Sequence, residues 1–214
     1  MARSAAAAPD IHEVVARLHQ AHPDARYELD WETPVQLLVA TILAAQCTDE
    51  RVNRVTKTLF VTYPDARAFA EADRAELEEA LKPTGFFRQK AKTVQEVCQA
   101  LVDRHGGEVP NTMEAMVRLP GIGRKSANVV LNTAWDLPTG IIVDTHVNRV
   151  APRMGLSRET KGDAIERDLM AVVPRSEWTF FGPAMVLLGR YTCTARAPKC
   201  DGCVMADICP KVGV

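Results

Sequence analysis

Four cysteines stand close together at the end of the chain. Cys193, Cys200, Cys203 and Cys209 follow the spacing C-x6-C-x2-C-x5-C within the last 22 residues. Four thiolates this close in sequence can converge on one centre, either a zinc ion or a 4Fe–4S cluster. Structural zinc sites usually show two close ligand pairs, whereas this run has a single C-x2-C with larger loops on both sides. The spacing therefore favours the iron–sulfur cluster over zinc.

A second candidate site is a turn in which two glycines bracket an apolar residue. Gly121-Ile122-Gly123 separates two helical patterns, 112–118 and 124–135. Glycines let the backbone turn tightly and expose consecutive N–H groups at the start of a helix, whose dipole favours an anion. Ile122 is expected to be buried between the two helices. A tight connection without a ligand is the alternative for a bare G-x-G, but Lys125 on the first turn of the second helix favours an anion site.

Charge is uneven along a chain that is almost neutral overall. The 214 residues include 26 Lys and Arg against 27 Asp and Glu, a formal net charge of −1, which at first argues against a highly charged partner. Residues 1–118, however, carry 14 basic and 18 acidic side chains, whereas residues 119–214 carry 12 basic and 9 acidic ones. A basic C-terminal part is what a nucleic-acid face needs, although a surplus of this size is by itself usually only solvated surface.

No segment of the sequence has the character of a membrane span or a secretion signal. The longest apolar run, Leu37–Ala45, is nine residues long, far short of the roughly 20 needed to cross a bilayer. The N-terminal segment, Met1–Asp10, is too weakly apolar for a signal peptide. We therefore expect an intracellular protein, in the cytoplasm or nucleoid. In a reducing compartment, metal ligation is a better interpretation of clustered cysteines than disulfide bonding.

Helical signals dominate the chain and must position these sites. Two short β-looking stretches, 61–63 and 141–143, are too isolated to build a sheet. The sequence therefore predicts an all-α fold, in which Cys47 and Cys98 lie in apolar helices as buried small hydrophobic residues. A capping box at 33–36 opens an apolar helix that runs through Ala45, and a second capping box runs from Asn111 to Glu114. An acidic helix starts near Asp73, and an amphipathic helix over 89–102 is closed by Gly106-Gly107.

Longer strings resemble the helix-hairpin-helix DNA glycosylases, and among them the endonuclease III family. Residues 119–127, LPGIGRKSA, are similar to the hairpin of base-excision glycosylases, where the turn holds a DNA phosphate without reading sequence. The cysteine run is similar to the cluster loop of the endonuclease III family, which raises the expectation of a 4Fe–4S cofactor. The strings LAAQCTD at 43–49, VDTHVNR at 143–149 and GRYTC at 189–193 extend the resemblance over nearly the whole chain.

The resemblance implies a bifunctional DNA glycosylase and abasic-site lyase that removes oxidised pyrimidines in base excision repair by β-elimination. Lys125 would then be the amine that attacks the sugar, kept neutral by the helix N-terminus, by Arg124 and by partial burial. Asp144 would supply negative charge to the developing oxocarbenium ion or help to move protons. Taken alone, Lys125 could be a phosphate-contacting surface lysine. Asp144 is expected to be the N-cap of a helix beginning near Thr145 as well.

The resemblance also implies contacts with double-stranded DNA that carries a damaged base or an abasic site. Gln46 would fill the gap left by the extruded nucleotide, and the turn at 84–87 would form a second wedge, although related sequences commonly carry an aliphatic residue where Phe86 stands. His146 fits either a structural role at the helix start or a phosphate contact, and Leu188 departs from the family pattern in a way that could affect substrate range. The remaining expected DNA contacts are Gly121, Ile122, Gly123 and Arg124 in the hairpin, and Arg190, Arg196 and Lys199 near the cluster, where they could also neutralise its charge.

The family architecture implies two helical domains that flank a DNA-binding cleft. Residues 27–137 would form a helical barrel domain with the hairpin, and residues 1–26 with 138–214 the iron–sulfur domain of a monomer. Two alternatives remain at this point. An adenine-mismatch glycosylase would lack the hairpin lysine and carry a further C-terminal domain. A non-catalytic DNA-binding module would bind DNA without cleaving it.

Overall fold

The structure, a computed structural model of the whole chain, describes residues 8–214, so most of the N-terminal segment used to exclude a signal peptide lies outside the described residues. The described part is helical and contains no strand, which confirms the predicted all-α fold. The segments 61–63 and 141–143 form no sheet. No helix in residues 8–214 is both long and apolar enough to cross a membrane.

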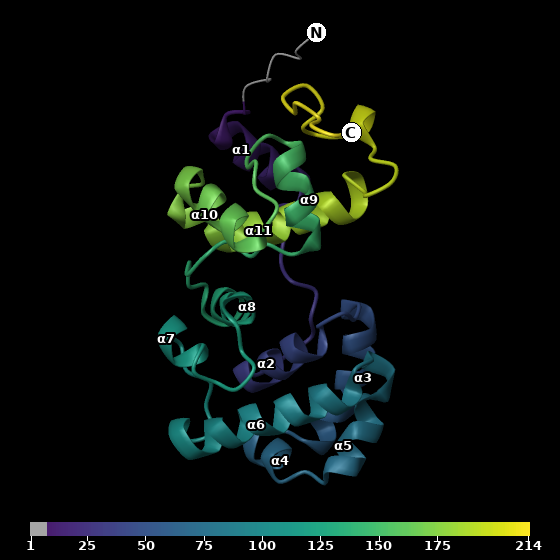
Figure 1. Cartoon of the computed structure of the whole chain (residues 1–214), viewed down its shortest axis with the longest axis vertical. Coiled ribbons are helices and arrows are strands. Elements are labelled where there is room, and N and C mark those ends of the chain that lie inside the picture. The colour runs from purple at the N-terminus through teal and green to yellow at the C-terminus, as the bar shows by residue number, and fades with distance from the viewer. Residues whose placement is uncertain (1–7) are drawn as a thin grey trace. The chain divides into compact units, whose positions relative to one another are not determined.

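The chain forms two compact units (Figure 1). One consists of Glu28–Asp136 and is continuous in sequence, and the other combines the described part of Met1–Tyr27 with Leu137–Val214. The continuous unit contains α2 (Pro34–Leu43), α3 (Asp49–Thr62), α4 (Ala66–Ala70), α5 (Arg74–Leu81), the 3-10 turn η1 (Lys82–Thr84), α6 (Phe87–His105), α7 (Met113–Met116) and α8 (Arg124–Trp135).

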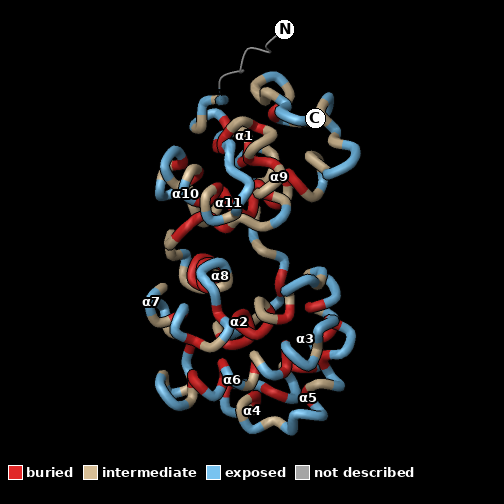
Figure 2. Tube along the Cα trace, viewed as in Figure 1, coloured by how far each residue is buried: buried red, intermediate tan, exposed pale blue. Residues whose placement is uncertain are grey.

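The continuous unit is built around α6, the longest of its helices. Helices α4 and α5 pack against α6, and α2 packs against both α6 and α8. Figure 2 shows the buried stretches of α2, α6 and α8, to which Leu38, Val94, Leu101 and Leu131 belong. Burial of these apolar side chains is the main force that holds the helices together. The hairpin between α7 and α8 is therefore carried by a packed helical core.

Most of the predicted helix boundaries in this unit are confirmed. Thr33 caps α2 with Pro34 at the first position, and Asp73 caps α5. Helix α6 ends at Gly106, which takes the left-handed backbone conformation that favours glycine. Cys98 is buried in α6 as expected, but Cys47 lies between α2 and α3 and is only half-buried, so that prediction was wrong. Two predictions of helix boundaries were also wrong. The N-cap of α7 is Thr112 rather than Asn111, and α2 ends at Leu43, before Ala45, because the chain then turns away towards Gln46.

The discontinuous unit joins the first helix of the chain to the last ones. Its elements are α1 (Ile11–Ala21), α9 (Thr145–Arg153), α10 (Gly162–Val172), the 3-10 turn η2 (Arg175–Glu177), α11 (Trp178–Leu187), the π-helical turn η3 (Leu188–Thr192) and the 3-10 turn η4 (Cys200–Gly202). Apolar side chains of α1, α9, α10 and α11 form one core, against which Cys193, Cys203 and Cys209 pack. Arg17 on α1 donates to the carbonyl of Val204 at 2.7 Å and to Asp207 at 2.9 Å, so the first helix is tied to the cysteine loop.

Candidate functional site

The predicted hairpin is present as a tight turn between α7 and α8. Ile122 is 5% exposed, which confirms that it anchors the turn in the core. Gly121 has φ +70°, a conformation that favours glycine, and a Cβ there would lie 3.0 Å from Cγ2 of Thr93, so the packing also leaves little room for a larger residue. Gly123 has an ordinary φ of −88°, and no atom lies within 4 Å of a Cβ placed on it. The space beside Gly123 is therefore open to a ligand.

Helix α8 begins directly after this open position and has no side-chain cap. Gly123 is its N-cap, so no cap side chain occupies the N–H groups at the start of the helix. Arg124 and Lys125 occupy the first turn, and both are exposed. The partial burial expected for Lys125 was wrong, because the residue is exposed. An uncapped helix start with exposed basic side chains is suited to hold a phosphate.

Asp144 is the N-cap residue of α9, in the discontinuous unit. Its Oδ1 atom accepts hydrogen bonds from the backbone N–H groups of His146 at 2.8 Å and Val147 at 2.9 Å, which confirms the expected N-cap. The carboxylate is thus fixed by two bonds from its own helix, while its residue remains partly exposed. A half-buried carboxylate held in this way needs little further ordering to act on a bound group.

His146 packs where α9 meets the π-helical turn η3. Its Nδ1 lies 3.2 Å from Nη2 of Arg149, and a Cβ added to Gly189 would lie only 2.8 Å from the His146 Cβ. Arg149 also donates to the carbonyls of Gly189 at 2.8 Å and Cys193 at 3.1 Å. Glycine at position 189 therefore allows η3 to approach α9 closely, and Arg149 holds the chain there.

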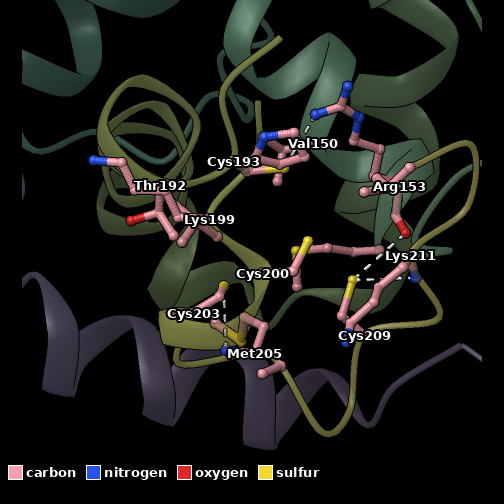
Figure 3. Close-up of a pocket in the computed structure, with 15 residues that line it drawn as sticks. Val150, Arg153, Thr192, Cys193, Lys199, Cys200, Cys203, Met205, Cys209 and Lys211 are labelled. Carbon is pink, nitrogen blue, oxygen red and sulfur yellow. Dashed lines mark hydrogen bonds between the residues drawn. The ribbon is translucent and has the colours of Figure 1, made fainter. Parts of the chain in front are cut away.

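The four C-terminal cysteines line one cavity (Figure 3). None of them is in a disulfide. Three of the sulfur atoms have an N–H donor: Cys193 from Nη1 of Arg153 at 3.5 Å, Cys203 from the Met205 backbone at 3.4 Å, and Cys209 from the Lys211 backbone at 3.4 Å. Donors of this kind stabilise thiolate ligands, so the residues fit the predicted cluster.

The cavity combines burial with compensating charge. Burial raises the pKa of the Cys203 and Cys209 thiols, and backbone N–H donors act in the opposite direction. Four thiolates around an oxidised core of about 2+ give the cluster a net charge of roughly −2. Three basic residues that line the cavity can compensate this negative charge. Within residues 8–214, no group of three or more His, Cys, Asp or Glu side chains is arranged to hold a single metal ion. The basic lining residues are Arg153, Lys199 and Lys211.

Two arginines that sequence reasoning missed organise the cysteine loop. Arg149 and Arg153 are four residues apart on α9 and therefore share one face of it. Arg153 donates to the carbonyls of Thr194 at 2.8 Å and Ala195 at 3.0 Å. Their spacing on the helix was the signal available in the sequence, but their partners lie about 40 residues further along the chain.

The other expected site residues differ in their surroundings. Lys199 lines the cysteine cavity, Arg196 is exposed, and Arg190 is half-buried in η3. Leu188 is 2% exposed and lines the same cavity, so it packs beside the cysteines. Gln46 is exposed and has φ +52°. The hairpin residues and Gln46 belong to the continuous unit, whereas Asp144, His146 and the cysteine loop belong to the other.

Comparisons with known proteins agree with the geometry of the hairpin and the cysteine loop. Residues 39–175 match the HhH-GPD superfamily of base excision DNA repair proteins, and residues 193–209 match the iron-sulfur binding domain of endonuclease III. Endonuclease III of Synechocystis sp. is 50% identical over 199 residues, which cover 93% of this chain and 91% of that protein.

Solved structures of endonuclease III on DNA share the fold. A non-covalent endonuclease III–DNA complex superimposes with a TM-score of 0.89 at 39% identity, covering 94% of each chain. A trapped covalent endonuclease III–DNA intermediate, the estranged-adenine complex, gives the same TM-score, identity and coverage. These likenesses confirm the predicted fold type, the iron–sulfur cofactor and the DNA glycosylase and lyase class. The chain is a DNA-binding base excision repair protein with an iron–sulfur domain, and it belongs to the endonuclease III family.

Proposed function

We propose that this chain removes oxidised pyrimidines from double-stranded DNA and then cleaves the abasic strand, with Lys125 as the nucleophile and Asp144 as the assisting carboxylate. The observation that carries the proposal is the exposed Lys125 amine on the first turn of a helix whose N-terminus has no side-chain cap. Anion binding at that terminus would place a DNA phosphate next to the amine.

The chemistry requires a neutral amine and a departing base. The Lys125 nitrogen attacks C1′ of the damaged nucleotide, and the electron pair of the glycosidic bond leaves with the base. The amine then loses its proton, its lone pair breaks the C1′–O4′ bond while O4′ takes up a proton, and the resulting iminium ion links Lys125 to C1′. Loss of the C2′ proton drives the electrons towards the iminium and expels the 3′ phosphate in β-elimination. Water finally hydrolyses the link and restores the lysine.

Asp144 contributes a fixed negative charge near the sugar. Its Oδ1 is engaged by two backbone N–H groups, which leaves Oδ2 to interact with positive charge that develops on the sugar or to accept a proton. The iron–sulfur cluster, held by Cys193, Cys200, Cys203 and Cys209, supplies a cross-link that fixes the surrounding loop. DNA contacts are assigned to Gln46, Gly121, Ile122, Gly123, Arg124, His146, Arg190, Arg196 and Lys199.

The active protein is a monomer of two domains. Residues 27–137 act as a barrel domain that carries the hairpin, and residues 1–26 with 138–214 as the cluster domain. The protein acts inside the cell as a monomer. Light scattering should therefore give a mass near 23.5 kDa for the free protein and a single copy on a lesion duplex.

Borohydride trapping tests the nucleophile. Borohydride reduces the iminium link to a stable amine, so the native protein should become covalently attached to a duplex that contains an oxidised pyrimidine. Lys125→Ala should bind the same duplex without attachment. Arg124→Ala, the neighbouring cation on the same helical turn, should weaken binding but still be trapped. Binding without attachment by the native protein would instead identify a non-catalytic DNA-binding module.

A further inference from the structure

A buried lysine in the continuous unit has no part in the proposed chemistry. Lys90 is 4% exposed and lies on the first turn of α6. Its Nζ donates to the carbonyl of Leu43 at 2.8 Å and to the carbonyl of Thr84 at 2.7 Å. Burying an ammonium group is costly unless its hydrogens are bonded, so these two contacts must be well made. Lys90 therefore ties the segments of Leu43 and Thr84 together inside the unit.

The two carbonyls lie at the ends of two separate elements. Leu43 is the last residue of α2, and Thr84 is the last residue of η1. Carbonyl groups in the last turn of a helix have no partner within the helix and carry the negative end of its dipole. The Lys90 ammonium satisfies both ends at once, and it joins segments that lie 47 and 6 residues away in sequence.

Each of these ends leads directly into an exposed loop with unusual backbone geometry. Gln46 has φ +52° and Phe86 has φ +48°, and they are two of only four non-glycine residues with positive φ in residues 8–214. Phe86 is 66% exposed, a large apolar side chain held out in water. Such conformations persist only where the surrounding structure imposes them. The exposed side chains of both loops are therefore presented at the cost of backbone strain.

Lys90 holds the second loop from two sides. Its backbone N–H donates to the carbonyl of Phe86 at 3.0 Å, while its side chain reaches back to Thr84. Gly85, between them, has φ +70° and no atom within 4 Å of a Cβ, so the turn has no packing of its own on that side. Lys90 therefore bonds to the turn on both sides of Gly85, at the carbonyls of Thr84 and Phe86.

We propose that Lys90 is a positioning residue that locks the Gln46 loop and the Phe86 loop into one two-pronged probe, which enters the duplex when the damaged nucleotide is extruded. The inference rests on the proposed function, which assigns Gln46 to the gap in the stack, and on the wedge role that the family resemblance implies for the turn at 84–87; what is new is that Lys90 couples the two loops. An aromatic ring suits this place because it can stack on a neighbouring base of any type.

Lys90 can hold both carbonyls whether or not its amine is protonated. Burial lowers the pKa of Lys90, but even the neutral amine keeps two N–H donors, enough for both carbonyls. Methionine has a similar length and no donor, so Lys90→Met removes the lock and retains much of the packing. Lys92, two residues further on the same helix, is exposed and pairs at 3.8 Å with Glu96, which makes Lys92→Met the matched control.

Base extrusion and chemistry can be measured separately. In a Lys125→Ala background, which cannot react, fluorescence of 2-aminopurine placed beside the lesion reports unstacking alone. We expect Lys90→Met to abolish most of the fluorescence rise and Lys92→Met to leave it intact. Borohydride trapping tests the proposed function separately, so a failure of extrusion in Lys90→Met can be distinguished from a failure of Lys125 as the nucleophile.

The reaction itself supplies the second readout. In otherwise native protein, Lys90→Met should slow cleavage of a lesion duplex at least tenfold, while β-elimination at an abasic site in single-stranded DNA, which needs no extrusion, stays within twofold. Lys90→Arg, which keeps N–H donors, should recover part of the duplex activity. Equal loss on both substrates in a variant that melts like the native protein would show that Lys90 does not act through extrusion, and no loss on either would show that the lock is unnecessary; both results overturn the proposal.

A third measurement leaves Lys90 unchanged, in case its replacement unfolds the unit. If the two prongs enter together, the losses caused by Gln46→Ala and Phe86→Ala on duplex substrate should not add in the double variant. Additive losses would mean that the loops act independently, which overturns the proposal as well.

Discussion

Asp144 has two tasks, one structural and one chemical, and they can be separated by substitution. The structural task is to cap α9 through two hydrogen bonds of 2.8 and 2.9 Å to one oxygen. Replacing such a cap with alanine costs about 0.5–2 kcal/mol. For a chain of about this length, 1 kcal/mol corresponds to a melting temperature shift of about 2–4 °C. Asp144→Ala should therefore melt a few degrees below the native protein.

Asparagine caps a helix about as well as aspartate, but it carries no charge. Asp144→Asn should keep the native melting temperature, because its side-chain oxygen can accept the same two N–H groups. It should still lose about 10²–10⁴-fold in the rate of base release, the usual contribution of a positioned acid or base. Single-turnover release of the base and differential scanning calorimetry measure the two effects on the same samples.

The chain contains a matched control for the cap. Asp73 caps α5 through Oδ1, which accepts from the backbone N–H groups of Ala75 at 2.8 Å and Glu76 at 3.0 Å, the same arrangement as at Asp144. Asp73→Ala should therefore lower the melting temperature by a similar amount and leave base release unchanged. The reasoning is refuted if Asp144→Asn works at the native rate, or if Asp73→Ala loses activity to the same degree as Asp144→Ala.

Three further predictions concern glycines and a cysteine. Gly121→Ala should lose about 1–2 kcal/mol of stability, because residue 121 has a left-handed φ that alanine adopts only at a cost. Gly123→Ala should keep the native melting temperature but bind a lesion duplex more weakly in fluorescence anisotropy. Equal melting temperatures for the two variants would contradict the claim that the φ of Gly121 favours glycine. Gly189→Ala should cost about 1–3 kcal/mol in denaturant unfolding through a 2.8 Å clash, and Gly202→Ala, with nothing within 4 Å, should cost almost nothing. Burial raises the pKa of Cys98 to about 12, so at pH 9 iodoacetamide should label this thiol only after denaturation, as mass spectrometry of the peptide can verify.

Much of the fold could be predicted because its signals are local. The helices α2, α5 and α8 begin at caps, a proline or a glycine whose effects act within one turn, and the apolar spacing then marks the buried face. The cap of α7 was predicted one residue too early, because Asn111 and Thr112 are adjacent and both are good caps; in the structure Thr112 accepts the hydrogen bond from the N–H of Ala115.

The parts of the site that could not be predicted depend on distant segments. Arg149 and Arg153 looked like ordinary basic residues of α9, since their carbonyl partners lie 40 to 44 residues away. Lys90 lay within a helix whose polar face was expected to be in water, and it is buried by the ends of α2 and η1. The positive φ of Phe86 likewise has no signal in the sequence, because tertiary contacts impose it.

The bonds between Arg17 and the cysteine loop set an order for the making of this protein. The unit of residues 28–136 is continuous, so its core can close while the ribosome still holds the rest of the chain. Helix α1 is synthesised before the continuous unit, yet Val14 and Leu18 find their core only with later helices, and Arg17 can meet Asp207 only after all the residues between them have been made. Helix α1 therefore leaves the ribosome before the continuous unit but is held in place only after it, and in a chain truncated before the cysteine loop this helix should be exposed to proteolysis.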